Sequence, residues 1–245
     1  MRKFLALMVV AVALASSGCV FSPKPDPKGT TPPTPLPPND TPANAIERFR
    51  LSYEQKKAPE YQASFTGDFT YEFSTSTDPT LVQQYSTGWF KNDEKESSSH
   101  LFAGYTPPGG NTLEPASTIS INLAVKLPTD DNSSGVDPTT HKVLATPVDG
   151  QIVVPNTGAD ATTYVITNNF NVFYLVRGDQ AVNLDTTQPA DSSHWYIYRW
   201  VDLTGTGGAA PAGGIRTASA TTRTQSTSQP ALLPMSWGGV KGAWR

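Results

Sequence analysis

The chain has 245 residues, with 18 Lys or Arg against 21 Asp or Glu, so its formal net charge is −3. Nucleic-acid binding calls for a basic patch or stripe, and the few basic residues here are scattered, which argues against nucleic acid as a partner. Cys19 is the only cysteine, which excludes a disulfide framework and a thiolate metal site.

The N-terminus has the layout of an export signal. After a short basic start, an apolar stretch from Phe4 to Leu14 is too short to span a bilayer, and small residues then lead to Cys19. This segment resembles the lipobox of bacterial lipoproteins, which implies that residues 1–18 are a signal peptide and that Cys19 carries the lipid that anchors the chain to a membrane. Ser16 stands where that pattern prefers a leucine-like residue, so a plain secretory signal cleaved nearby is the alternative.

The rest of the chain divides by composition. Val20, rather than aspartate, follows the cysteine, which in didermal bacteria implies release toward the outer membrane, facing the periplasm or the surface. Residues 19–42 are rich in proline and poor in apolar residues, which predicts a flexible tether. Residues 43–203 are long enough for one hydrophobic core. Residues 204–245 form a low-complexity tail whose end carries two tryptophans that could dock back on the domain.

The pattern of apolar residues predicts helices first and strands afterwards. We expect helices over about residues 45–57, 60–65 and 93–102, and a strand of alternating aromatic residues from Phe69 to Phe73. Everything after Pro108 is expected to be strand, with the clearest runs at 118–127, 142–154, 162–177 and 194–203. This order favours an α+β fold in which N-terminal helices pack on a strongly curved antiparallel sheet that forms a cone.

Two aromatic segments carry a family resemblance. The segment from Ile46 to Phe73 and the run from Trp195 to Asp202 resemble the nuclear transport factor 2-like (cystatin-like, polyketide-cyclase-like) superfamily. The closer resemblance is to its uncharacterised bacterial lipoproteins, through Trp89, the acidic helix at Glu94 and the ending from Trp237 to Arg245. The resemblance implies a cone with a pocket on its concave face, and a homodimer is a further expectation.

The last strand supplies the candidate ligand contacts. In strict alternation Tyr198, Trp200 and Asp202 share one face, and in this superfamily the concave face of such a strand lines the pocket. They are therefore predicted to bind a ligand, with a purely structural packing role as the alternative. A bulge near Arg199 would instead move Trp200 to the other face of the strand.

No catalytic residue is assigned. Enzymes of the superfamily hold a carboxylate or histidine in the cone, and the candidates here are Asp68, Glu72, Glu94, Asp202, His100 and His194. None forms a recognisable pair: Glu72 is expected to point to solvent, and Glu94 to belong to a solvated helix start. The histidines lack metal-ligand spacing, so we expect no metal and no cofactor.

Two short motifs are interpreted as turns. Arg177, Gly178 and Asp179 form a tripeptide that some adhesive proteins display, but Gly-Asp after a strand is typical of a hairpin turn. The acidic residues from Asp130 to Asp137 lack the spacing of a calcium loop and are interpreted as a polar hairpin tip.

The sequence thus predicts a membrane-anchored extracytoplasmic lipoprotein whose cone binds a small apolar ligand or a protein partner without catalysis. Two alternatives remain open. The first is an isomerase- or dehydratase-like enzyme that uses a carboxylate in the cone. The second is a structural or assembly subunit that dimerises through its sheet.

Overall fold

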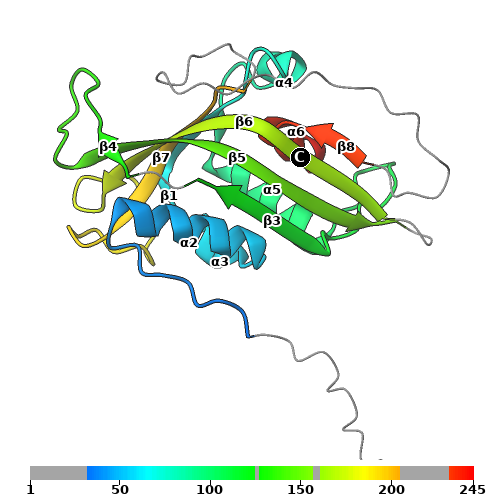
Figure 1. Ribbon diagram of the computed structural model, residues 1–245, viewed down its shortest axis with the longest axis horizontal. Helices are drawn as coiled ribbons and strands as arrows, with labels where there is room; N and C mark the ends of the chain where they lie inside the picture. The colour runs from blue at the N-terminus through cyan, green and yellow to red at the C-terminus, as the bar shows by residue number, and fades with distance from the viewer. Residues whose placement is uncertain (1–31, 125–126, 157–160, 205–231) are drawn as a thin grey trace, which may run out of the picture. The chain divides into compact units, whose positions relative to one another are not determined.

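The computed structural model describes residues 32–124, 127–156, 161–204 and 232–245 (Figure 1). The chain divides into Met1–Thr34 and Pro35–Arg245, and every helix and strand below belongs to the second unit. The predicted signal peptide, the predicted lipidation site Cys19 and most of the predicted tether and tail lie outside the described residues.

Most of the described helices lie in the N-terminal half of the domain, and the longest strands follow them. The helices are α2 Pro42–Glu54, α3 Ala58–Gln62, α4 Pro79–Gln84, α5 Lys91–Ala103 and α6 Trp237–Ala243. The strands are β1 Phe65–Glu72, β2 Trp89–Phe90, β3 Thr118–Leu123, β4 Thr129–Asp130, β5 His141–Pro155, β6 Ala161–Arg177, β7 Trp195–Asp202 and β8 Leu232–Met235. Within the described parts of the chain, no helix is long and apolar enough to cross a membrane.

The predicted first helix is confirmed as α2. The Thr41 hydroxyl caps it by accepting a hydrogen bond from the backbone N–H of Asn44 at 3.2 Å. Ile46, Phe49 and Tyr53, spaced by three and four residues, are buried on one side of the helix. The residues just before it also contact the domain, since the backbone N–H of Trp195 donates to the carbonyl of Asn39 at 2.9 Å.

The sheet is mixed, which corrects the prediction of a purely antiparallel sheet. Its strand order is β2-β1-β7-β6-β5-β3, with β4 paired to β5 and β8 paired to β6. The pairs β1/β7 and β6/β8 are parallel, and the other pairs are antiparallel. Parallel pairing needs a long crossover rather than a hairpin, and the chain between β1 and β7 contains two helices and several strands.

Bulges bend the long strands. The register of β5 against β6 shifts between Val148 and Gly150, and that of β6 against β7 shifts between Tyr174 and Leu175. A Cβ atom at Gly150 would lie 2.5 Å from the carbonyl oxygen of Ser120, so only glycine permits β3 to approach β5 this closely. The result is a curved sheet that stays open at β2 and β3, and the predicted α+β class is confirmed.

The core lies on the concave face of the sheet. Phe49 of α2, Leu101 of α5 and Trp237 of α6 belong to one buried cluster with Phe173 and Trp200 of the sheet. Helix α6 corrects the expectation that everything after Pro108 is strand. In Figure 1 the C-terminal β8 and α6, coloured red, lie beside β6. The tryptophan-containing end of the chain is therefore docked on the domain.

Candidate functional site

Trp200 is the centre of an aromatic cluster on the concave face. Its ring centroid lies 4.8 Å from Phe173 of β6, 5.1 Å from Tyr71 of β1 and 5.3 Å from Phe49 of α2. Trp237 of α6 completes the cluster at 5.5 Å. Such ring pairs bury large areas with defined geometry, so the cluster fixes where α2 and α6 sit on the sheet.

A buried carboxylate lies next to this cluster. Glu94 of α5 is 1% exposed. One of its oxygens accepts the hydroxyl hydrogen of Tyr61 at 2.5 Å, and the other accepts the indole N–H of Trp89 at 3.0 Å. Burial and the neighbouring charge of Glu94 hold the pKa of the Tyr61 hydroxyl well above its ordinary range, so Tyr61 stays a donor.

The counter-charge comes from the C-terminal helix. The ammonium of Lys241 forms an ion pair with Glu94. It also lies 4.2 Å from the ring centroid of Trp200 and 4.7 Å from that of Tyr71, which are cation–π distances. Burial lowers the pKa of Lys241, and the nearby Glu94 carboxylate opposes that effect. One ammonium is thus enclosed by a carboxylate and two aromatic faces.

Asp202 is a second buried acid on this face, at the end of β7. Its carboxylate accepts the backbone N–H of Thr204 at 2.9 Å and the hydroxyl of Tyr71 at 3.3 Å. Burial raises its pKa, and the hydrogen bonds from Thr204 and from the backbone of Gly238 act in the opposite direction. The acid is held by the domain and by the first turn of α6.

The structure separates the three predicted ligand contacts. Because of the bulge, Tyr198 has no partner in the β6 register, while Trp200 pairs with Phe173 and Arg199 with Tyr174. Trp200 and Asp202 therefore lie on the concave face, whereas Tyr198 lies with Tyr174 on the opposite face. That these residues bind a ligand stays a prediction.

The hydroxyl of Tyr198 instead donates to Asp131 at 2.9 Å. Burial, reinforced by this hydrogen bond, raises the pKa of Tyr198. This contact ties β7 to the segment that follows β4, away from the concave site.

The other acids and histidines considered in the sequence do not meet. Glu72 is exposed, as predicted, and pairs with Arg199 at 2.6 Å, and Asp68 is exposed. His100 is bonded to the carbonyl of Trp244 at 2.8 Å. In the part of the chain that is described, no group of three His, Cys, Asp or Glu side chains could hold a metal ion.

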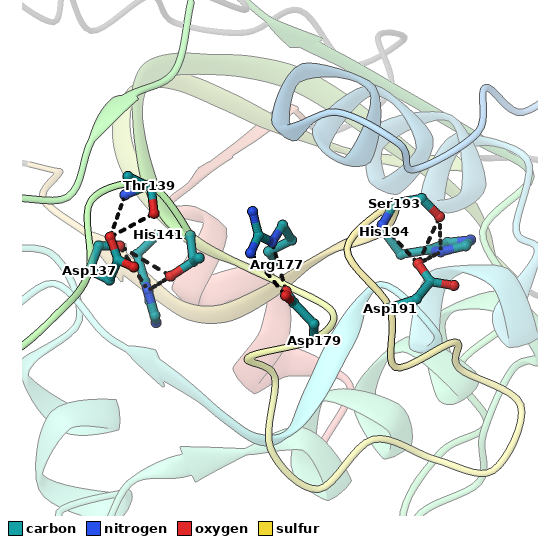
Figure 2. Close-up of polar contacts among 9 residues, drawn as sticks. Asp137, Thr139, His141, Arg177, Asp179, Asp191, Ser193 and His194 are labelled. Carbon is teal, nitrogen blue, oxygen red and sulfur yellow. Dashed lines mark hydrogen bonds and ion pairs between the residues drawn. The ribbon is translucent and has the colours of Figure 1, made fainter.

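Figure 2 shows the polar loops around the end of β6. Arg177 and Asp179 form two hydrogen bonds with each other, at 2.7 and 2.9 Å, and the chain turns at residues 178–180, but residues 178–194 join β6 to β7, which corrects the prediction of a tight hairpin. In the same connection, just before β7, Ser193 and the Nδ1 atom of His194 both contact one oxygen of Asp191 at 2.7 Å, and Ser193 also contacts that same Nδ1. A serine nucleophile needs serine and aspartate on opposite ring nitrogens, so this loop is not a catalytic triad.

The sequence interpretation missed the main polar pair. Glu94 was expected in a solvated helix start, and this expectation is wrong because Tyr61, Trp89 and Lys241 enclose it. The available signal was the spacing of Trp237, Lys241 and Trp244, which places all three on one side of a helix.

Comparison with known proteins gives matches among solved structures. No family model matches the chain, and no curated protein matches it. One similar structure is a nuclear transport factor 2-like protein of unknown function in nutrient uptake from Rhodospirillum rubrum, with 13% identity, 67% of this chain and 98% of that chain covered, and a TM-score of 0.37.

Two others carry related names. A ketosteroid isomerase-like protein from Erwinia carotovora is 12% identical over 64% of this chain and 88% of its own, with a TM-score of 0.37. A nuclear transport factor 2-like superfamily protein from Salmonella enterica is 9% identical over 70% of this chain and 94% of its own, with a TM-score of 0.38. At these identities the likeness concerns the fold alone. Two of these structures are named for the nuclear transport factor 2-like superfamily, which the aromatic segments of the sequence resemble.

Proposed function

We propose that the chain is a membrane-anchored extracytoplasmic lipoprotein whose concave face binds a protein partner or a small apolar ligand without catalysing a reaction. The anchoring part rests on the sequence, where the apolar stretch from Phe4 to Leu14 and the small residues after it lead to Cys19. A single acyl chain gives only marginal binding, so stable anchoring requires more than one.

The binding part rests on one observation, the occupation of the concave face by an inserted helix. Lys241 of α6 sits between Glu94 and Trp200, so this face accommodates a segment with aromatic and charged side chains. Proton-transfer catalysis needs an acid or base directed at a reacting group. Glu94 instead interacts with three protein donors, Tyr61, Trp89 and Lys241, which favours a binding role over a catalytic one.

One observation favours the enzymatic alternative. Asp202 is buried on the concave face and its pKa is raised by burial, a property that general acids and bases share. For catalysis, a substrate would have to contact the Asp202 carboxylate in place of the N–H groups of Thr204 and Gly238. Asp202 is therefore the residue whose substitution separates the two functions.

The anchoring part is tested by fractionating cells of a didermal host that express the full chain or Cys19→Ala, with a lipid analogue fed to both. We expect the full chain to enter the membrane fraction and to carry label on the peptide that begins at Cys19. The variant should remain unlabelled. A labelled variant, or an unlabelled native cysteine, would contradict lipidation at this site.

The binding part is tested with a photo-reactive amino acid placed at Val82, which lines an open pocket of about 220 Å³ together with Tyr71 and Tyr85. The matched control carries the same group at Tyr174, on the opposite face of the sheet. We expect an adduct from Val82 only, and the same adduct when Asp202→Asn is added. An adduct from Tyr174 only would favour assembly through the sheet, and a bound molecule that the parent converts but Asp202→Asn leaves unconverted would favour the enzymatic alternative.

A further inference from the structure

The C-terminal segment, Leu232–Arg245, is inserted in the domain as a ligand would be. Strand β8 adds to β6 in parallel, from Thr163 paired with Leu232 to Ile166 paired with Met235. Helix α6 then buries the side chains of Trp237, Val240, Lys241 and Trp244. The last three lie three, four and seven residues after Trp237, so all four share one side of the helix, and that side enters the concave face.

The segment has little structure of its own to contribute. Helix α6 has seven residues, and three of them are Gly238, Gly239 and Gly242. Glycine disfavours the helix, and so short a helix is marginal in isolation. Its position is therefore determined by contacts with the domain, such as the hydrogen bond from the backbone N–H of Trp237 to Asn169 at 2.9 Å.

The groups that surround the Lys241 ammonium all belong to the rest of the domain, outside the C-terminal segment. Tyr61 and Trp89 orient the carboxylate of Glu94, and Tyr71 and Trp200 present their ring faces beside it. None of these five residues belongs to the C-terminal segment. A carboxylate next to two aromatic faces is an arrangement that binds a compact cation.

The fit of the segment is incomplete. The indole N–H groups of Trp237 and Trp244 are buried, and neither has a hydrogen-bond acceptor among the described residues. A buried donor without a partner weakens an association. The covalent connection through residues 205–231 compensates, because it keeps the segment at a high local concentration near its site.

We propose that Leu232–Arg245 is an internal ligand of the cone, and that its external counterpart is a segment of a protein partner that presents a lysine between aromatic side chains. This inference rests on the proposed binding function and selects the protein partner over the small apolar ligand. An apolar ligand in place of α6 would leave Glu94 buried with the hydrogen bonds from Tyr61 and Trp89 but without a counter-charge, which is unfavourable. Lysine fits better than arginine because its ammonium is a compact point charge.

The test uses the full chain with Cys19→Ser, with and without a substitution that expels α6. A Cβ atom at Gly238 would lie 2.8 Å from the ring of Phe73 and 2.7 Å from the carboxylate of Asp78, so Gly238→Leu should displace the helix. The matched control is Ala243→Leu, which adds the same side chain at an exposed position of α6. The probes are a labelled peptide of residues 232–245 and the same peptide with methionine in place of lysine.

We expect the lysine peptide to bind Gly238→Leu about tenfold or more tightly than it binds the parent or Ala243→Leu, because only there is the site vacated. The methionine peptide should bind Gly238→Leu about tenfold or more weakly than the lysine peptide. Equal affinity for the two peptides would overturn the proposal that the site binds a lysine ammonium. Equal affinity of the three proteins would overturn the proposal that α6 competes with an external segment for the site.

A second measurement covers the case in which Gly238→Leu does not fold. Hydrogen exchange of the parent chain should show faster exchange in residues 232–245 when the lysine peptide is added, and no change with the methionine peptide. Unchanged exchange with both peptides would overturn the proposal. The Val82 cross-link, which is made without any peptide, reports separately on the proposed function.

Discussion

Lys241 of α6 and Glu94 of α5 form an ion pair in which each side chain is only 2% exposed, although 147 residues separate them in the sequence. Removing two charges from water costs more than their attraction returns unless further hydrogen bonds satisfy them. Tyr61 and Trp89 supply those bonds to Glu94. The pair therefore specifies the position of α6 more than it stabilises the fold.

Breaking the pair from the two sides should have unequal effects. Glu94→Gln leaves the Lys241 ammonium buried without a carboxylate, and we expect it to lower the free energy of unfolding by about 3–5 kcal/mol. Lys241→Met leaves Glu94 with its donors Tyr61 and Trp89, so its effect should be smaller. Urea denaturation of both variants measures the difference.

The double variant Glu94→Gln with Lys241→Met is the control for this prediction. It removes both charges, and its amide oxygen can still accept a hydrogen bond from Tyr61 or Trp89, so it should recover part of the stability lost in Glu94→Gln. Additive losses in the double variant would mean that the two side chains act independently.

The two tryptophans of β7 should differ in their contribution to stability. Trp200 is 1% exposed and contacts rings from α2, β1, β6 and α6, so Trp200→Ala should cost about 3–5 kcal/mol. Trp195 is 8% exposed and pairs with Arg177 at the end of the strand, so Trp195→Ala should cost less. Thermal melts compare them, and near-native melting of Trp200→Ala would rule out the aromatic cluster as the centre of the core.

Features that depend on neighbouring residues could be predicted from the sequence. The periodicity from Ile46 to Tyr53 and the aromatic run of β7 are local signals, and both elements are confirmed. Helix α4 was not predicted, because Pro79–Gln84 buries no residue and so shows no apolar period. The docking of the chain's end was foreseen only as an option, since tryptophans alone do not identify their contacts.

Features that depend on distant residues could not be predicted. The burial of Glu94 follows from Lys241, and no local pattern links the two. The separation of Tyr198 from Trp200 follows from one extra residue in β7, which the sequence offered only as an alternative, a bulge near Arg199, because the partner strand decides whether that bulge forms. The parallel pairing of β1 with β7 depends likewise on the path of the intervening chain.

Cutting the connection between β7 and β8 should leave the C-terminal segment in place. A specific protease site inserted within residues 205–231 allows cleavage of the folded chain, and gel filtration should then show the fragment with Trp237 and Lys241 eluting with the domain. The contacts of these residues with Trp200 and Glu94 do not require the connection. The same cut in Gly238→Leu should release the fragment, and release from both chains would mean that the covalent link alone holds it.

The last prediction concerns the pH dependence that Asp202 gives to stability. Burial raises its pKa above the ordinary value of 3.8, so the folded state holds this proton more tightly than the unfolded state. Stability then falls as pH rises from the ordinary value through the raised one, because more protons are bound in the folded chain over that window.

Asp202→Asn has no proton to lose there, although its amide oxygen can still accept the N–H of Thr204. The variant should therefore be most destabilised relative to the parent at low pH, and the difference should shrink as pH rises toward neutrality. Urea denaturation of the two proteins over a pH series measures that difference. A difference that grows with pH would show that the fold favours the charged carboxylate, and that Asp202 is held chiefly by its hydrogen bonds.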